Sequence, residues 1–363
     1  MIQHKERETL PLVSIIIVNW NGKKWLKDCF ESLEKLDYPK DKYEVIMGDN
    51  ASSDDSVEFT DKNFPWIKIL KLDNNYGFAE GNNKCAKIAK GEFLVFLNND
   101  TFVDKNWLIE LVNSVIKDKS IKICESLEKP YANNIKEFLF YKRYLTLLGS
   151  GVTDKCIESI DKCYIEGYAN GSSLMIEKKL FDHLDGFDES YFMYGEELDL
   201  CWKAWIMEFK SMMIQSSIYY HKGCGDSHSV KTRKSFCMHN TKNRMMNILK
   251  NFEFHNVIYA ILISFLYNSF QIIKYLLLRC PHSVIDTIKA HLFVIRNLPE
   301  IFKKRRIIQK NRKISDKELY KMGLIFPLSK SIKKEINLSK IDIREFNLNK
   351  FKERALTIIN NKK

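Results

Sequence analysis

Four short apolar runs divide the first hundred residues, and each is rich in β-branched or aromatic residues. This composition predicts buried strands over residues 12–18, 43–47, 67–72 and 93–97. Helical patterns follow these runs, and the intervening segments are long enough for crossover helices. The alternation therefore predicts right-handed βαβ units in an α/β fold, with an open, doubly wound parallel sheet.

A polar cluster follows each run, where the predicted strand ends. The clusters are Asn19–Gly22, Gly48–Asp55, Asp73–Asn83 and Asn98–Thr101. Open α/β sheets bind ligands at the carboxyl ends of their strands, so this edge is the expected nucleotide or phosphate site. Asp100 is a hard oxygen ligand suited to Mg²⁺ or Mn²⁺. Alternatively, Asn99 or Asp100 could cap the helix expected around Trp107.

The middle of the chain is less regular. Residues 120–165 have mixed periodicity, and we interpret them as part of an acceptor pocket or lid. A later helix is predicted by the spacing of Leu198, Cys201 and Trp202. Glu196 and Glu197 lie in its first turn, where the helix dipole favours acidic side chains, so capping alone could explain them.

Charge and cysteine content limit the classes of partner and compartment. The formal net charge of +12 over 363 residues indicates a polyanionic partner: nucleic acid, phosphate esters or an anionic membrane surface. The nine cysteines show no regular spacing, which favours a reducing cytosol. His221, Cys224 and His228 could suggest zinc, but the sequence offers no fourth ligand at a suitable spacing. Residues 1–10 are expected to form a flexible lead without a secretory signal.

The last third of the chain changes character. Residues 257–278 approach the ~20 residues of a membrane span, but polar residues such as Asn268 and Gln271 interrupt them. An amphipathic helix is expected over residues 284–302, and the basic cluster 303–313 follows it. Apolar helices beside basic residues indicate attachment to an anionic cytoplasmic leaflet. A solvated helical subdomain with a basic face would give the same amphipathic pattern.

Six stretches in order across residues 12–250 resemble the family 2 glycosyltransferases, especially the rhamnosyltransferase-like branch. They are Val13–Gly22, Gly48–Ser52, Asn75–Asn83, Phe96–Thr101, Gly186–Glu189 and Phe192–Trp202. The resemblance implies a GT-A fold, with a mostly parallel sheet flanked by helices, over residues 11–252. Residues 11–118 would form its nucleotide-sugar half and residues 119–252 its acceptor half. Residues 253–363 would form a helical, basic, membrane-associated extension.

The resemblance also implies a nucleotide sugar lying across the strand ends. Asp49 would hydrogen-bond the pyrimidine ring, and Asp100 would hold Mg²⁺ or Mn²⁺ on the diphosphate, with His221 completing the metal site. The metal would act as a Lewis acid as the nucleoside diphosphate leaves. The chain has one carboxylate where many relatives have Asp-x-Asp. The other residues expected to bind the donor are Asn19, Asn75, Gly77, Asn82, Asn99 and Arg244; for Arg244, a structural ion pair is the alternative.

The family is inverting, which requires a carboxylate base to take a proton from the acceptor hydroxyl. Glu197 matches the second acid of the family's acidic pair and is the expected base, with Glu196 as the alternate. The expected function is transfer of a sugar from dTDP-rhamnose or a UDP-sugar to a glycan or lipid-linked saccharide. The enzyme would be cytoplasmic and peripheral on the inner face of the cell membrane, and would not bind nucleic acid.

Two other functions remain as alternatives. A sugar nucleotidyltransferase could use a similar sheet, but it would need a glycine-rich phosphate cradle, which Asn19–Gly22 does not provide. A non-enzymatic nucleic-acid-binding protein could use the basic C-terminus, but no recognition module is apparent in the sequence.

Overall fold

The computed structural model describes residues 9–130, 140–156, 163–222, 230–326 and 328–332. The lead expected at residues 1–10 therefore lies almost wholly outside the described residues. So do Cys224 and His228, which the zinc interpretation requires.

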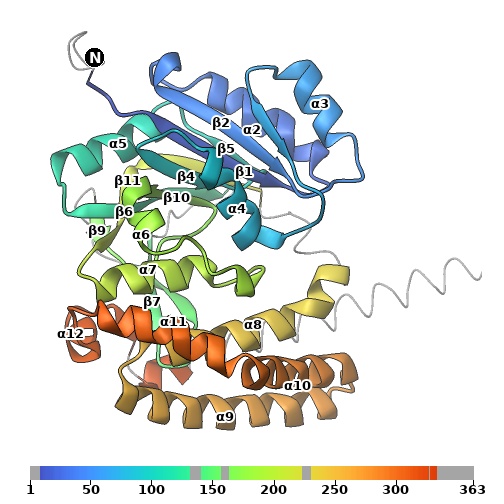
Figure 1. The fold of residues 1–363 in the computed structure, drawn as a ribbon, viewed down its shortest axis with the longest axis vertical. Helices are drawn as coiled ribbons and strands as arrows, with labels where there is room; N and C mark the ends of the chain where they lie inside the picture. The colour runs from blue at the N-terminus through green and yellow to red at the C-terminus, as the bar shows by residue number, and fades with distance from the viewer. Residues whose placement is uncertain (1–8, 131–139, 157–162, 223–229, 327, 333–363) are drawn as a thin grey trace, which may run out of the picture.

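A nine-stranded sheet forms the centre of the molecule, in the order β3-β2-β1-β4-β10-β6-β11-β5, with β9 paired to β11 (Figure 1). Its strands are β1 Val13–Asn19, β2 Tyr43–Asp49, β3 Lys68–Lys71, β4 Phe93–Leu97, β5 Thr101–Val103, β6 Ile121–Pro130, β9 Cys163–Ile165, β10 Ser173–Glu177 and β11 Lys210–His221. The four strands from β3 to β4 are mutually parallel, as predicted. Beyond β4 the sheet is mixed, because β10 runs antiparallel to both β4 and β6.

Helices cover both faces of this sheet. Helices α2 Lys23–Glu34, α3 Ser56–Asn63 and α5 Trp107–Lys117 pack on one face, whereas α4 Gly77–Ile88, α6 Lys178–His183 and α7 Glu196–Ile206 pack on the other. In β1, Ile15 and Ile17 belong to the first core and Ile16 to the second. Successive side chains of a strand point to opposite faces, so a strand buried on both faces needs a continuous apolar run.

The segment with mixed periodicity contains β6 and β9 of the main sheet and most of a small second sheet. That sheet comprises β7 Phe140–Thr146, β8 Gly151–Cys156 and β12 Ile325–Phe326. Buried charged residues explain why the strand pattern was weak here. Glu125 and Arg143 are almost fully buried, and they pair at 3.4 Å.

The C-terminal helices pack below α7 in Figure 1. They are α8 Val230–Asn251, α9 Phe254–Leu277, α10 Pro281–Arg296, α11 Leu298–Lys310 and α12 Asp316–Lys321. The predicted single helix over residues 284–302 is wrong, because α10 ends at Arg296 and α11 begins at Leu298, with Asn297 between them. Pro299, at the start of α11, has no N–H to continue the helix before it. A third core contains Trp202 of α7 together with Phe252 and Ile301. Hydrophobic packing therefore continues across the domain boundary expected after residue 252.

Candidate active site

A chain of hydrogen bonds links the carboxyl ends of β2 and β1 to the end of β4. Asn19 and Asp49 are register partners at the ends of β1 and β2. The Asn19 amide donates to Asp49 Oδ1 at 3.2 Å, and its carbonyl oxygen accepts from Asn99 Nδ2 at 2.8 Å. Asn19 is fully buried, so its contacts hold the two flanking site residues in place.

Asp49 is oriented by the turn that follows β2. Its Oδ2 accepts from the Ser52 backbone N–H at 2.9 Å, and its Oδ1 accepts from the Ser52 hydroxyl at 2.6 Å. A carboxylate offers roughly four acceptor positions. With the Asn19 bond, the described residues use three of these positions, which leaves one on Oδ2 for a donor group such as a pyrimidine N–H.

Side-chain amides shape the loop before α4 and the first turns of this helix. Asn75 Oδ1 accepts from the Gly77 N–H at 2.9 Å, and Gly77 has a φ of +72°. The buried Asn82 amide donates to the Phe78 carbonyl at 2.9 Å. The Phe78 N–H donates to the Phe192 carbonyl at 2.7 Å, which ties the start of α4 to the segment before α7. The expected donor residues of this loop thus shape the backbone beside the acidic helix.

Asp100 and His221 meet because β5 pairs with β11, with Thr101 opposite His221. His221 Nε2 lies 3.1 Å from Asp100 Oδ1, and Nδ1 lies 3.4 Å from Glu128 Oε1. Burial would lower the pKa of His221, but the hydrogen bonds to the two carboxylates outweigh it and raise the pKa to about 10. Glu128, on β6, was missed because it lies in the segment of mixed periodicity.

This donor set fits a divalent cation bound together with a phosphate ligand. A carboxylate oxygen and an imidazole nitrogen lie side by side, and Glu128 supports the second ring nitrogen, as carboxylates do behind metal-bound histidines. Among the described residues, no cluster of three His, Cys, Asp or Glu side chains forms a complete metal site. Asp100 and His221 would therefore need phosphate and water oxygens to complete the coordination, which suits Mg²⁺ or Mn²⁺.

A strained turn presents the acidic pair at the start of α7. Phe192, Tyr194 and Gly195 all have positive φ values, of 65°, 71° and 86°. Non-glycine residues in this conformation are costly and cluster at functional sites. Glu197 is half-buried beside this turn, and its Oε2 accepts from the Gly195 N–H at 3.2 Å.

Glu196 and Glu197 differ in burial and in the size of their pKa shift. Burial raises the pKa of Glu197 above 4.5. Burial, and then the neighbouring charge of Glu197, raise the pKa of Glu196 well above 4.5. Glu196 is only 4% exposed, and within the described chain its Oε2 has no hydrogen-bond partner. Glu197 is the more accessible acid, and it lies beside Gly171, where an added Cβ would lie 3.7 Å from the Glu197 Cβ.

Helix α8 forms hydrogen bonds to this turn, an interaction that the sequence did not reveal. Asn243 donates to the carbonyls of Met193 at 2.9 Å and Tyr194 at 2.6 Å. About two turns further along α8, the Asn251 side chain donates to Asp199 Oδ1 at 2.9 Å. Hydrogen bonds that side chains make across such long sequence separations leave no periodic signal. Only the neighbouring Asn243 and Arg244 pair could have drawn attention to α8.

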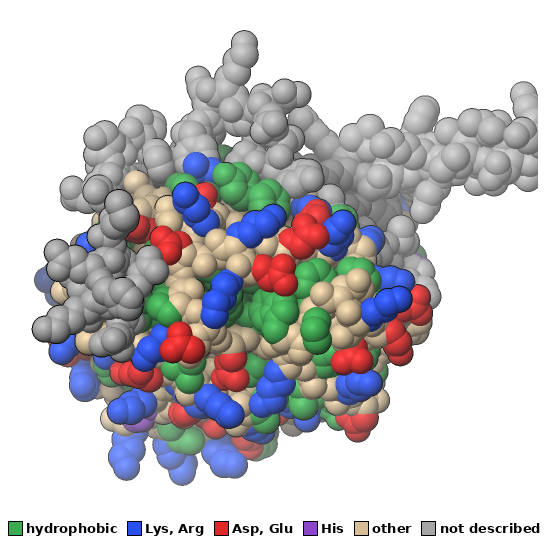
Figure 2. Space-filling model, turned by 90° about the horizontal axis from the view of Figure 1, so that it is seen from above, with side chains coloured by type: hydrophobic (Ala, Val, Ile, Leu, Met, Phe, Trp, Pro, Cys, Tyr) green, Lys and Arg blue, Asp and Glu red, His purple; other side chains and the backbone are tan. Residues whose placement is uncertain are grey.

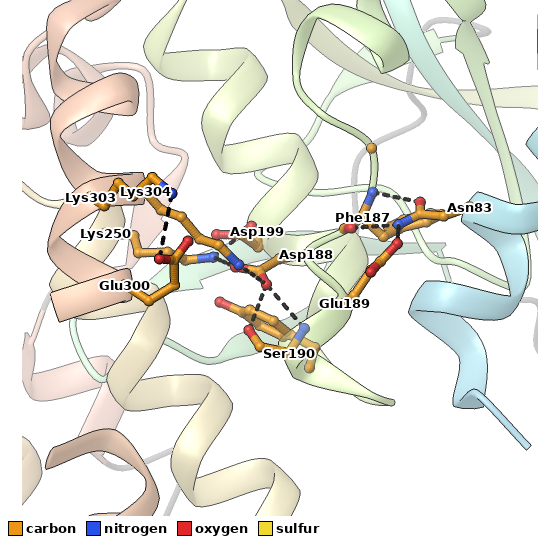
Figure 3. A network of polar contacts seen from close by, with 12 residues as sticks. Asn83, Phe187, Asp188, Glu189, Ser190, Asp199, Lys250, Glu300, Lys303 and Lys304 are labelled. Carbon is orange, nitrogen blue, oxygen red and sulfur yellow. Dashed lines mark hydrogen bonds and ion pairs between the residues drawn. The ribbon is translucent and has the colours of Figure 1, made fainter. Parts of the chain in front are cut away.

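Figure 3 shows two lysines converging on Asp188, in the loop before α7. Lys250 of α8 lies 2.7 Å from Asp188 Oδ2, and Lys304 of α11 lies 2.7 Å from Oδ1. Burial alone would raise the pKa of Asp188, but the two lysines hold it well below its usual range. The basic cluster at 303–313 is thus partly turned inward, with Arg305 donating to the carbonyls of Leu249 and Phe252.

Arg244 lies in a different environment from the strand-end residues. It is buried, its Nε donates to the Leu148 carbonyl at 3.2 Å, and its guanidinium lies 4.5 Å from the Tyr267 ring centroid. The described contacts do not join it to Asp49, Asp100 or Glu197. A diphosphate contact by Arg244 stays a prediction.

Comparisons with known proteins show which proteins part of this chain resembles. Residues 14–152 match the family model described as Glycosyl transferase family 2. Poly(ribitol-phosphate) beta-N-acetylglucosaminyltransferase TarS of Staphylococcus aureus is 32% identical over 98 residues, which are 26% of this chain and 17% of the relative. Rhamnosyltransferase WbbL of Escherichia coli is 24% identical over 204 residues, 52% of this chain and 75% of the relative. The matched segment thus spans less than a fifth of TarS.

Solved structures share the fold over most of the chain. S. aureus TarS 1–349 in complex with UDP-GlcNAc has a TM-score of 0.53 at 18% identity, covering 87% of this chain and 93% of that chain. GalNAc-T7 with UDP, GalNAc and Mn²⁺ has a TM-score of 0.54 at 18% identity, covering 68% and 50%. These similarities confirm the predicted GT-A fold.

Proposed function

We propose that this chain, which belongs to glycosyl transferase family 2 through residues 14–152, moves a sugar from a nucleoside diphosphate to an acceptor hydroxyl. The observation that carries the proposal is the contact between Asp100 and His221. These residues are far apart in sequence, yet they meet at the strand edge with Glu128 behind the histidine. A paired carboxylate and imidazole at this edge can hold a cation on the donor's diphosphate.

The donor that fits best is a pyrimidine nucleotide sugar. Asp49 keeps an acceptor position on Oδ2, and Asn19 fixes the direction of that carboxylate. The relatives support the same class, since WbbL is a rhamnosyltransferase and a TarS structure holds UDP-GlcNAc. We therefore propose dTDP-rhamnose or a UDP-sugar as the donor, bound along Asn19, Asp49, Asn75, Gly77, Asn82 and Asn99.

Asp100 and His221 would hold Mg²⁺ or Mn²⁺, and Arg244 remains a proposed diphosphate contact. When bound, the cation supplies Lewis-acid stabilisation of the charge that develops on the leaving diphosphate. Glu128 keeps His221 in position through Nδ1. A GT-A neighbour, GalNAc-T7, was crystallised with Mn²⁺, which supports a divalent cation in general.

Glu197 would act as the general base. Its carboxylate takes the proton from the acceptor hydroxyl while that oxygen forms a bond to the anomeric carbon. The bond from the anomeric carbon to the diphosphate breaks on the opposite face, so the configuration inverts. The hydrogen bond from the Gly195 N–H orients the Glu197 carboxylate. Burial raises the pKa of Glu197, which makes its carboxylate a better proton acceptor. Glu196 is the alternate base, although it is more deeply buried.

We further propose that the acceptor is a glycan or lipid-linked saccharide, at the cytoplasmic face of a membrane. A panel of nucleotide sugars, incubated with the full chain and Mg²⁺ or Mn²⁺, tests the donor class. Thermal stabilisation by one pyrimidine nucleotide sugar, reversed by EDTA, is expected. Equal stabilisation by ATP, GTP and the pyrimidine donors would contradict the proposed donor site.

A further inference from the structure

Helix α9 directs its large apolar side chains outward and its polar side chains inward. Its residues that are at least half exposed are Phe254, Ile258, Tyr259, Leu262, Phe265, Leu266, Phe270, Ile273, Leu276 and Leu277. Its buried residues include Ser264, Asn268 and Gln271. A helix of a water-soluble domain shows the reverse arrangement, with its apolar side facing the core.

The inward side of α9 is fixed to the protein along its length. Val257 and Ala260 belong to the third core, together with Val294 of α10. Near the middle of both helices, Asn268 of α9 lies 3.4 Å from His291 Nε2 of α10, which itself bonds the Thr287 carbonyl through Nδ1. A membrane-crossing helix would leave this globular body, whereas α9 lies flat against it.

Helix α10 widens the apolar surface. Ile285, Ile288, Leu292 and Ile295 recur every three or four residues and are 46–60% exposed. Since the central residues of α9 and α10 meet and a short turn joins the helices, they form an antiparallel hairpin. Figure 1 shows this hairpin at the lower edge of the molecule, opposite α2 and α3.

The hairpin is basic as well as apolar. Residues 254–299 contain Lys274, Arg279, Lys289 and Arg296 but one acid, Asp286. The opposite face differs, because Figure 2 shows acidic and basic side chains interspersed there. A second copy packed face to face would bring the four basic side chains of each hairpin together, with only Asp286 of each hairpin to offset them. An anionic bilayer complements both the apolar surface and the basic side chains.

We propose that α9 and α10, the apolar hairpin, lie in the interface of an anionic bilayer with the α9 axis parallel to the membrane. The hairpin is then a monotopic platform, in which the exposed apolar side of α9 enters the acyl boundary and the basic side chains meet the headgroups. This deepens the proposed function, since α8 and α11 connect the platform to the segment that precedes Glu197. Binding to lipid does not require that function to be correct.

Vesicle flotation of the full chain tests the platform. Phosphatidylcholine vesicles containing phosphatidylglycerol are expected to carry the protein, and pure phosphatidylcholine vesicles to carry several-fold less. The double variant Leu262→Glu with Leu266→Glu should lower the bound fraction at least tenfold, because both side chains face outward. Ile116→Glu, at a 48% exposed position on α5, is the matched control and should bind like the parent.

Equal binding of the double variant and the parent would overturn the proposal, as would failure of the parent to bind anionic vesicles. A dimer in vesicle-free buffer that the double variant dissociates, without vesicle binding by the parent, would assign the surface to a second copy instead. Thermal unfolding of each variant verifies its fold. Hydrolysis of the nucleotide-sugar donor is measured separately in vesicle-free buffer. This assay tests the proposed chemistry without membrane binding, so the two proposals can fail independently.

Measurements of how deeply α9 enters the bilayer distinguish a helix that lies in the interface from one that spans the membrane. Tryptophan placed at Phe254, Phe265 or Leu276, in three separate variants, reports the two ends and the middle of α9. With lipids brominated at shallow or deep acyl positions, a lying helix gives similar, shallow quenching at all three sites. Deep quenching at Phe265→Trp with shallow quenching at both ends would show a spanning helix and contradict the platform.

Discussion

The ammonium group of Lys250 lies 2.7 Å from the carboxylate of Asp188, and both side chains are almost fully buried. The same ammonium group lies 2.9 Å from Asp199 Oδ2 in α7. Asp188 and Asp199 flank the turn that presents Glu197. One lysine of α8 therefore pairs with two acids from the segments on either side of the proposed base.

Replacing Lys250 with Met should strongly destabilise the protein. Removing one partner of a buried ion pair leaves uncompensated charge and costs about 3–5 kcal/mol. Urea unfolding followed by tryptophan fluorescence measures the loss. Lys303→Met is the matched control, because Lys303 is 72% exposed and its ion pair among the described residues is with the exposed Glu300. It should change the free energy of unfolding by less than about 0.5 kcal/mol. Similar midpoints for both variants would contradict the structural role of Lys250.

Gly77 should tolerate no side chain, because it combines a positive φ with a close backbone contact. A Cβ there would lie 2.4 Å from the Phe192 carbonyl oxygen. Gly323 is the matched control: its φ is +67°, but a Cβ would meet no other described atom within 4 Å. Gly323→Ala should cost about 1–2 kcal/mol, whereas Gly77→Ala should cost about 3 kcal/mol or more, since overpacking adds to the strain. Thermal unfolding compares the two variants. Equal losses of stability would show that the Phe192 carbonyl can move away from an added Cβ at little energetic cost.

Asp100→Asn should weaken the binding of a nucleoside diphosphate in the presence of Mn²⁺ by about tenfold or more, as expected when a metal ligand or its support is removed. In EDTA, the parent and the variant should bind alike, because the carboxylate then has no cation to hold. Isothermal titration with UDP and with dTDP measures both conditions. Asp118→Asn, a change of an exposed carboxylate, serves as control. Binding by the parent that is the same with Mn²⁺ and EDTA would exclude the proposed metal role of Asp100.

Glu196 should make stability depend on pH. Its pKa is raised by burial in the folded protein, so the folded state binds more protons than the unfolded state above pH 4.5. The free energy of unfolding from this group is therefore greatest below pH 4.5 and falls as pH rises toward the folded pKa. Glu196→Gln removes that decline, so the variant should gain stability relative to the parent between pH 5 and pH 8. Parallel urea-unfolding profiles across this range would contradict the burial of a protonated Glu196.

The strands that position the donor side were predictable because their burial on both faces needs continuous apolar runs. Phe93–Leu97 was predicted with the bounds that the structure has for β4. The meeting of Asp100 and His221 followed from the family resemblance and not from any local pattern. Glu128, Asn243 and Lys250 were not predicted, because each acts through side-chain bonds across long sequence separations. Polar residues inside α9 were seen in the sequence, but only the structure shows that they face inward.

Release of nucleoside diphosphate from the preferred donor tests the central claim most directly. The full chain should release it with Mn²⁺ or Mg²⁺ and a saccharide acceptor, and form a product of inverted anomeric configuration by NMR. Glu197→Gln should lower the rate at least about a hundredfold, the usual range for losing a general base, while binding the donor as the parent does. Glu196→Gln should keep most of the activity. Full activity in Glu197→Gln, or no release from any pyrimidine nucleotide sugar, would contradict the account.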